Sequence, residues 1–259
     1  MGRYTERMIA LVEAGGGQVS EQMFVDKPGV LVLSTAEGVR REALQLFDQL
    51  NIYTGQSNED RLAEFTARIT YLSFPNNPDQ AKSESQRLHA LLKASGHTSP
   101  YEVAGLQPNV LVAGISIETM LEIIANKYAI GRVCSSRTDA MTVPLFRVPD
   151  AGPEVQRVIR AYIKSVAPLH SALIASVMQS DTQGLSGKDL KEIINMGHPG
   201  YKAGFMVVAA TPDFWEKKIA RRLSDNPDGV ELELRGILKQ LADALHQVCP
   251  EIHPSSQYA

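Results

Sequence analysis

The balance between helical and strand-like hydrophobic patterns limits the fold more than any other feature of this sequence. Apolar residues recur along most of the chain at the three- and four-residue spacing of an amphipathic helix. Three short apolar runs, at residues 29–34, 110–115 and 205–210, have the length and composition of buried strands. We therefore predict an α+β fold in which long helices accompany a few strands.

Capping residues predict where the helices begin. Ser57, with Asp60 three residues later, indicates a helix over residues 60–71, and Ser116 indicates one over residues 117–127. Thr211 and the proline after it are typical of a helix start, and this helix is expected to reach residue 222. Further helices are expected over residues 37–50, 82–94 (with Leu88, Leu91 and Leu92 buried) and 230–248, and from residue 153 onward with an interruption at Pro168.

The composition is that of a globular protein. The chain has 259 residues, a formal net charge of −3 and 44% hydrophobic residues, which excludes disordered and collagen-like chains. Its two cysteines are too few for a disulfide framework, and no apolar run approaches the ~20 residues of a membrane span. We expect a soluble, cytoplasmic protein that binds no membrane. Its near-neutral charge argues against binding of polymeric nucleic acid.

Several common catalytic motifs are missing. Residues 15–17 are three glycines without the spacing of a dinucleotide fingerprint, and residues 186–189 lack the Ser or Thr with which a P-loop binds Mg²⁺. The six histidines form no HxxxH pair, so we expect no metal site, and there is no GxSxG elbow. Cys134 has no histidine beside it in the sequence, and Cys249 is expected to be a half-buried small hydrophobe. Difficult chemistry would therefore need a bound cofactor.

Residues 95–138 concentrate side chains that suit a small-molecule site. His97, Ser99 and Glu102 lie in a short polar turn that Pro100 rigidifies, and they offer donors, acceptors and one titratable ring. His97 follows a helix end, so its alternative role is to cap that helix. The turn is therefore a candidate ligand-binding segment.

Further along the chain, the eleven residues 127–137 include three cations and two serine hydroxyl groups. Lys127, Arg132 and Arg137, together with Ser135 and Ser136, suit a phosphate group, because arginine forks, a lysine charge and short hydroxyl hydrogen bonds all stabilise its oxygens. Simpler interpretations stay open. The serines could be turn residues, Arg132 a solvated charge, and Lys127 and Arg222 could be favoured at helix ends by the dipole alone.

The ordered motifs resemble those of the flavin-dependent thymidylate synthases. Residues 96–102 (GHTSPYE) are similar to the family's GHxSPxEH turn, and residues 125–127 (ANK), seven further residues and Ser135 keep the spacing of its RHR-x7-S signature. Residues 67–71 (ARITY) are similar to its AARVSF segment, whereas Arg222 and residues 231–235 (ELELR) are similar to its LR and AQxEIR elements. The resemblance spans roughly residues 60–250.

The resemblance implies a fold, a reaction and a set of ligands. The family has a central, mostly antiparallel sheet with long helices, forms homotetramers, and methylates C5 of dUMP with FAD, methylenetetrahydrofolate and NADPH. Reduced flavin supplies the hydride, so no protein nucleophile is needed. By position, Arg222 would be the catalytic residue at the pyrimidine carbonyl. Nucleotide binding would fall to Ser135, Ser136, Arg137, Arg132 and Glu122, and FAD binding to Thr70, His97, Ser99, Glu102, Asn126, Lys127 and Glu233.

The sequence departs from the family pattern at several positions. Ala125 and Asn126 replace the first two residues of RHR, Glu122 replaces a glutamine, Thr138 a tyrosine and Val103 a histidine. We hypothesise a pocket altered to accept UMP as well as dUMP, as in the UMP/dUMP C5-methylases of polyoxin-type nucleoside-antibiotic biosynthesis. The alternatives are a non-catalytic flavin- or nucleotide-binding paralogue, a flavin enzyme with another reaction, and a helical interaction module.

The first part of the chain has no counterpart in the compact members of that family. We therefore predict an N-terminal α/β extension over residues 1–55, followed by a thymidylate synthase-like domain over residues 56–259. The extension would lie beside the site or enlarge an interface between subunits.

Overall fold

A five-stranded antiparallel sheet forms the centre of the molecule. The computed structural model describes residues 3–125, 129–133, 145–179, 190, 202–225 and 232–258. The strand order is β4 (Gly38–Val39), β3 (Gly29–Thr35), β5 (Asn109–Ile115), β8 (Gly204–Ala209) and β6 (Ile130–Val133), and every neighbouring pair is antiparallel. The three strands predicted from apolar runs are confirmed as β3, β5 and β8. The expected mixture of helices with an antiparallel sheet is confirmed with them.

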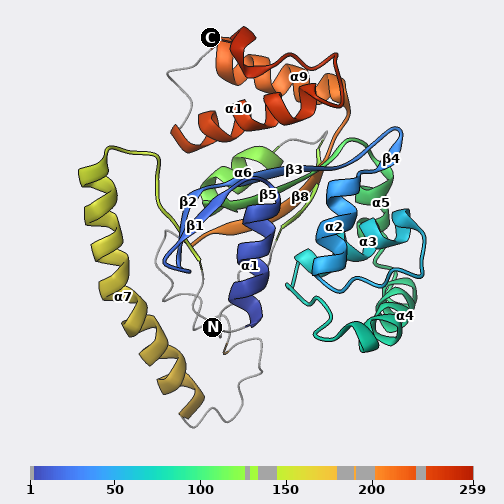
Figure 1. Cartoon of the computed structure of the whole chain (residues 1–259), viewed down its shortest axis with the longest axis horizontal. Coiled ribbons are helices and arrows are strands. Elements are labelled where there is room, and N and C mark those ends of the chain that lie inside the picture. Colours follow the sequence, from blue (N-terminus) through green and yellow to red (C-terminus); the bar gives the residue numbers. More distant parts are fainter. Residues whose placement is uncertain are drawn as a thin grey trace.

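Helices cover both faces of this sheet (Figure 1). Every residue of β5 and β8 is buried, as a strand covered on both faces requires. Alternate side chains point to opposite sides, so Val110 and Val208 pack in one cluster and Leu111 and Val207 in another. The first cluster lies under α6 (Ile117–Ile124), α9 (Pro212–Ala220) and α10 (Leu232–His246), and the second under α1 (Arg3–Ala14), α2 (Arg41–Gln49) and α3 (Asn58–Ile69).

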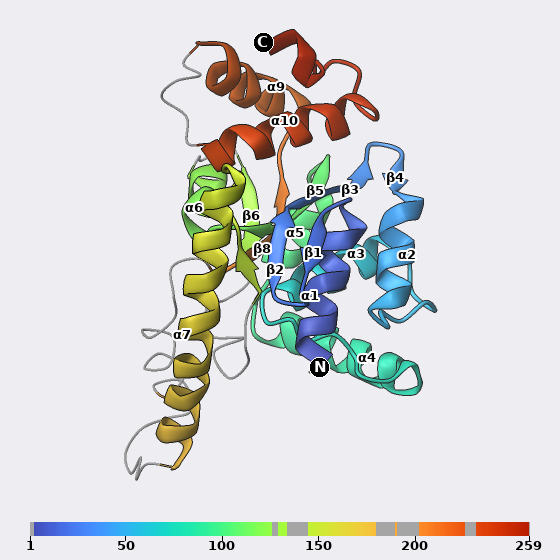
Figure 2. The same cartoon turned by 60° about the vertical axis from the view of Figure 1, so that its left-hand side comes forward.

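A second, smaller sheet lies beside the first. It contains β1 (Gln18–Ser20), β2 (Phe24–Lys27) and β7 (Phe146–Arg147), and β2 and β7 are parallel. The long helix α7 (Pro153–Gln179) packs against it through Ile163 and Ala167, and otherwise stands at the side of the body (Figures 1 and 2). The predicted interruption at Pro168 is wrong, because α7 continues through this proline, which removes one backbone donor without ending the helix.

The predicted helix caps are confirmed. Ser57, Ser116 and Thr211 each accept a hydrogen bond from the backbone N–H three residues later and thereby begin α3, α6 and α9. Several bounds differ from the prediction by a few residues. The helix expected from residue 37 begins as α2 at Arg41, because β4 uses residues 38–39, and α4 (Pro78–Ala94) begins four residues early, capped by Asn77.

The segments around the predicted ligand-binding turn also differ in detail. Leu91 on α4 is 60% exposed, so its predicted burial is wrong; the helix buries the face of Leu92 instead. The polar turn forms the short helix α5 (Ser99–Gly105), and α9 continues as a π-helical turn, η1 (Arg221–Asp225). Helix α6 ends at Ile124, three residues before the predicted end.

The predicted division after residue 55 remains a prediction. Residues 29–35 form β3, which pairs with β5 of the later segment, so the two segments share one sheet. Within the part of the chain that the structure describes, no helix combines the length and the apolar character needed to cross a bilayer.

Candidate functional site

A basic cavity of about 620 Å³ lies where the ends of α5 and α6 meet α9 and η1. Its apolar lining includes Leu106, Ala125 and Phe214. The cations are contributed by α9 and η1, where two pairs of basic residues lie four positions apart and therefore on one helix face. They are Lys217, Lys218, Arg221 and Arg222, with Thr211 and Asp213 completing the lining. The cavity therefore combines an apolar surface with positive charge.

Two residues predicted on separate grounds meet at this cavity. Arg222 Nη2 donates to Glu122 Oε2 across 3.0 Å, although the residues are 100 positions apart in the chain. Their side chains are 36% and 41% exposed, so the pair is accessible to a ligand and is partly screened by water. The expected catalytic arginine and the residue that replaces the family's glutamine are therefore direct partners.

Lys218 belongs to the same cluster. Its ammonium donates to the backbone carbonyl oxygens of Glu122, at 2.7 Å, and of Ile123, at 3.2 Å. These carbonyls belong to the last turn of α6, where such groups lack partners within the helix. Burial lowers the pKa of the Lys218 ammonium, as does Arg222, while the Glu122 carboxylate raises it. Lys218 thereby fixes the end of α6 immediately before the ANK motif.

The outer cations differ in how they are engaged. Lys217 Nζ donates to Asp213 Oδ2 at 2.8 Å in a well-exposed pair, which contributes little to stability. Arg221 is exposed, and within the described residues no ion pair engages it. An anionic ligand could therefore bind Arg221 without first breaking an ion pair to a described residue.

The predicted FAD-binding turn is linked to the basic cavity through Leu106, the residue that follows α5. The ring of His97 is exposed, Ser99 begins α5, and Thr98 Oγ1 donates to Glu102 Oε1 at 2.6 Å. Helix α5 contacts α3, which ends just before Thr70, and also contacts β6. Leu106, immediately after α5, lines the basic cavity. Three of the segments that carry the family-like motifs therefore meet around α5.

The remaining predicted residues have different placements. Arg132 lies half-buried on β6, opposite Val207 of β8. Five predicted contacts lie outside the described residues, namely Asn126, Lys127, Ser135, Ser136 and Arg137. Their roles stay predictions.

Glu233 is held in structural contacts away from the basic cavity. Its carboxylate accepts hydrogen bonds from the Ser116 backbone N–H at 3.1 Å, the Thr119 hydroxyl at 2.7 Å and Arg147 Nε at 2.7 Å. Arg147 is buried and also donates to the backbone oxygens of Val25 and Asp26. The pair lines a second cavity of about 310 Å³. Arg147 was not singled out from the sequence, because the two-residue strand β7 leaves no periodic signal.

The sequence analysis also missed Lys217 and Lys218. The signal that could have found them is the spacing KKxxRR at the end of a capped helix, which places four cations on one face. Across the described residues, no group of three or more histidine, cysteine or carboxylate side chains could hold a metal ion.

Comparisons with known proteins give structural likeness without sequence likeness. No protein-family model matches the chain, and no curated protein matches it. Among solved structures, it is similar to the UMP/dUMP methylase PolB from Streptomyces cacaoi bound with 5-Br UMP, at 14% identity and a TM-score of 0.45 over 91% of this chain and 96% of that chain. The same methylase bound with 5-Br dUMP matches at 13% identity and a TM-score of 0.46, over 91% and 97% of the two chains.

Proposed function

We propose that this chain is a methyltransferase that methylates C5 of UMP or dUMP, with methylenetetrahydrofolate as the one-carbon donor, FAD as the cofactor and NADPH as the reductant. One observation carries the proposal: Arg222, which is paired with Glu122, lines a basic, partly apolar cavity together with Leu106, which follows the GHTSPYE segment, and Ala125, the first residue of the ANK motif. A nucleoside monophosphate has the matching chemistry, a dianionic phosphate joined to a flat ring.

The cavity offers each part of such a nucleotide a partner. Arg221 is available for a phosphate, which arginine binds through its planar fork. Leu106 and Phe214 give apolar surface for a pyrimidine face. Arg222, held by Glu122, can donate to a pyrimidine carbonyl and stabilise negative charge that develops on the ring during methyl transfer. Ser135, Ser136 and Arg137 would complete the phosphate site, with Arg132 nearby.

The same residue types fit FAD. A flavin needs cations for its diphosphate and apolar surface for its ring, and the segment before α5 adds the exposed ring of His97. Ser99, Glu102 and Thr70, together with Asn126 and Lys127, would hold it, and Glu233 would act only at a distance through α6. When bound, FAD would supply the reducing electrons for the transferred one-carbon unit. The protein would orient the two rings and exclude water between them.

We also propose a homotetramer in the cytoplasm. Helix α7 carries Val155, Val158, Tyr162 and Leu169 at 50–68% exposure, and their spacing places them on one side of the helix. An exposed apolar stripe of this length supports an interface with another copy. The molecular mass of the native protein in solution, which gives the number of subunits, tests this part of the proposal.

The direct test is an activity assay with both nucleotides. The chain is incubated with FAD, NADPH, methylenetetrahydrofolate and either UMP or dUMP, and the product is identified by mass. Arg222→Gln should lower kcat/KM roughly 10- to 100-fold, the range expected when a hydrogen bond to a charged group is lost. Lys239→Gln on α10 removes an exposed cation away from the cavity and serves as the control.

The outcomes separate the alternatives. A yellow protein that binds nucleotide and forms no 5-methyl product would identify a non-catalytic paralogue. A product of another mass would indicate a different flavin reaction. If neither nucleotide binds and neither is methylated, the proposed function is wrong.

A further inference from the structure

A fully buried carboxylate lies at the centre of the helices that support α5. Glu64 on α3 has no exposed surface, and its two oxygens are engaged by three neighbouring segments. It accepts hydrogen bonds from Arg68 Nε at 2.7 Å, Gln56 Nε2 at 2.6 Å and Ser85 Oγ at 2.8 Å. A buried charge is costly unless it is paired and hydrogen-bonded, so this degree of satisfaction is needed to keep Glu64 ionised.

Glu64 is ionised at neutral pH in this environment. Burial alone would raise the pKa of its carboxyl group, but interactions with His89, Arg68, Gln56 and Ser85 outweigh burial and hold the pKa at about 2. The negative charge therefore persists and can orient neighbouring dipoles. One neighbouring polar group that has no hydrogen-bond partner among the described residues is Nε2 of the His89 ring.

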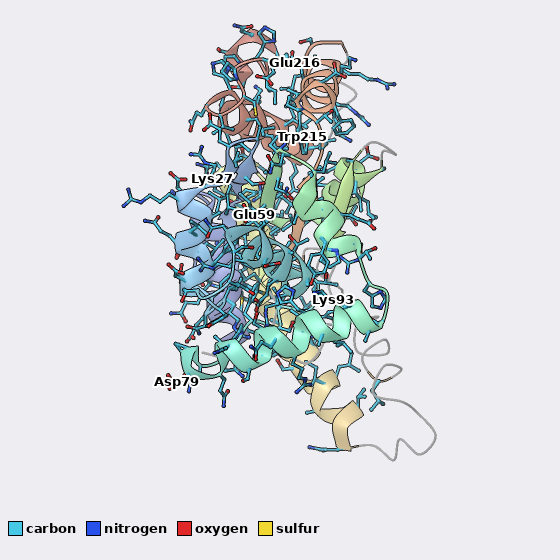
Figure 3. The ribbon with its side chains drawn as sticks, turned by 90° about the vertical axis from the view of Figure 1, so that its right-hand side faces the viewer. Lys27, Glu59, Asp79, Lys93, Trp215 and Glu216 are labelled. Atoms are coloured by element: carbon cyan, nitrogen blue, oxygen red, sulfur yellow. The ribbon has the colours of Figure 1, made fainter. Side chains whose placement is uncertain are left out.

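His89 lies between this charge and α5. On α4, its Nε2 is 3.8 Å from Glu64 Oε2 and, within the described residues, has no hydrogen-bond partner. Its Nδ1 lies 2.5 Å from the hydroxyl of Tyr101, the third residue of α5. Figure 3 shows α4 running across the lower part of the view from Asp79 to Lys93, and this helix contacts α3.

The Glu64 charge selects one tautomer of the His89 ring. If Nδ1 carried the proton, the Nε2 lone pair would face an anion, which is unfavourable. If Nε2 carries the proton, its N–H dipole points toward Glu64, and Nδ1 is free to accept from Tyr101. Burial and the charges of Asp60 and Glu64 raise the pKa of the Tyr101 hydroxyl, so it keeps its proton and donates.

We propose that Glu64, His89 and Tyr101 form a positioning triad that fixes the orientation of α5 and so presents the 97–102 turn to the ligand. The triad transfers no proton. The carboxylate orients the imidazole, and the imidazole orients the phenol. The hydrogen bond from the phenol to the imidazole then fixes α5 relative to α4. The role in ligand binding rests on the proposed function, whereas the hydrogen-bonding arrangement does not.

Ring NMR of ¹⁵N-labelled protein at pH 8 tests the arrangement without any activity. The His89 signals are assigned by their loss in His89→Asn. We expect the His89 ring to be protonated at Nε2 and unprotonated at Nδ1, which accepts a hydrogen bond. A ring protonated at Nδ1 overturns the proposal.

Amide hydrogen exchange tests whether the triad holds α5. Tyr101→Phe removes one hydroxyl and keeps the ring, so exchange over residues 99–106 should accelerate about tenfold, as expected for the loss of one net hydrogen bond. Tyr4→Phe on α1 is the matched control, because the Tyr4 ring is 38% exposed. Unchanged exchange in Tyr101→Phe would refute the triad.

A second pair of variants distinguishes loss of the His89 hydrogen bond from a general loss of packing. His89→Asn places an amide near the position of Nδ1 and should keep much of the α5 protection, whereas His89→Ala should lose it. Equal loss in both would show that only packing matters at this position and would overturn the proposal.

Calorimetric titration with FAD, dUMP and UMP connects the triad to the site. If the triad presents the turn, Tyr101→Phe should weaken nucleotide or FAD binding several-fold while Tyr4→Phe leaves it unchanged. Equal affinity in wild type and Tyr101→Phe would refute the positioning role. If wild type binds none of these ligands, the proposed function fails, and the tautomer and exchange results still decide the triad.

Discussion

Replacing Glu64 with glutamine should remove a pH-dependent part of the folding free energy. The pKa of Glu64 is about 2 in the folded chain and 4.5 in its ordinary state. Because the folded value is the lower one, the ionised carboxylate stabilises the fold above pH 4.5 and loses that effect as the pH falls toward 2. The difference corresponds to about 3 kcal/mol, of which about 2 kcal/mol is lost by pH 3.

The variant differs from wild type most at neutral pH. Glutamine cannot ionise, so Arg68 keeps its charge in a buried place without its partner, at a cost of about 3–5 kcal/mol. On acidification the wild type loses the Glu64 contribution and the variant has none to lose. The gap in unfolding free energy between the two proteins should therefore narrow by about 2 kcal/mol between pH 7 and pH 3.

Urea unfolding measures this gap directly. Trp215, the only tryptophan, lies on α9 (labelled in Figure 3) and is fully buried in the hydrophobic cluster that α9 shares with α10 and the sheet. It reports unfolding by fluorescence, with far-UV circular dichroism as a second probe. Glu59→Gln, at the exposed start of α3, the helix that carries Glu64, is the control and should change stability by less than about 1 kcal/mol. A gap that stays constant from pH 7 to pH 3 would refute the assignment of a depressed pKa to Glu64.

Three further substitutions and one control test other parts of the structure by the same urea measurement. Arg147→Met should cost about 3–5 kcal/mol, because it leaves Glu233 charged and half-buried without its partner; a loss below 1 kcal/mol would contradict this. Lys218→Met should cost about 1–2 kcal/mol by freeing two α6 carbonyls. Since burial lowers the Lys218 pKa, wild type should gain stability over that variant as the pH rises toward 10.5. Leu238→Ala in the α10 core should cost about 2–5 kcal/mol, whereas Lys239→Met on its exposed side should stay within about 0.5 kcal/mol.

Local chemistry explains which elements could be predicted from the sequence. Ser57, Ser116 and Thr211 cap helices through contacts only three residues away, so their signal is complete in the local sequence. The strands β3, β5 and β8 are buried on both faces and therefore form continuous apolar runs. In both cases the residues that determine the element lie within it.

Elements that depend on distant partners could not be predicted in this way. Strands β4 and β7 have two residues each, too few for a period, and they exist because β3 and β2 provide partners. Leu91 was expected to be buried because α4 is apolar around it, but only the pairing of faces between helices decides which leucine is covered.

Individual residues of the candidate site could be predicted from the sequence, but the contacts between them could not. Arg222 and Glu122 were each identified from a motif, and the structure adds that they are partners across 3.0 Å. Lys218 could not be assigned its role from the sequence, because its two acceptors are backbone oxygens of a helix about 95 residues earlier. Backbone acceptors have no residue-type signature, so such contacts leave no trace in a motif.

Helix α3 shows the same limit for charge. Arg61, Glu64 and Arg68 are spaced three and four residues apart, which on sequence alone is typical of a solvent-facing stripe. In the structure every residue from Arg61 to Ile69 is buried. The burial is tolerated because the charges pair, Arg61 with Asp48 at 2.5 Å and Arg68 with Glu64 at 2.7 Å, and because Ser85 of α4 fills a remaining acceptor position. A polar stripe therefore does not distinguish a solvated helix face from one that another helix covers with matching donors; only the covering helix decides, and here that helix also carries the histidine that reaches α5.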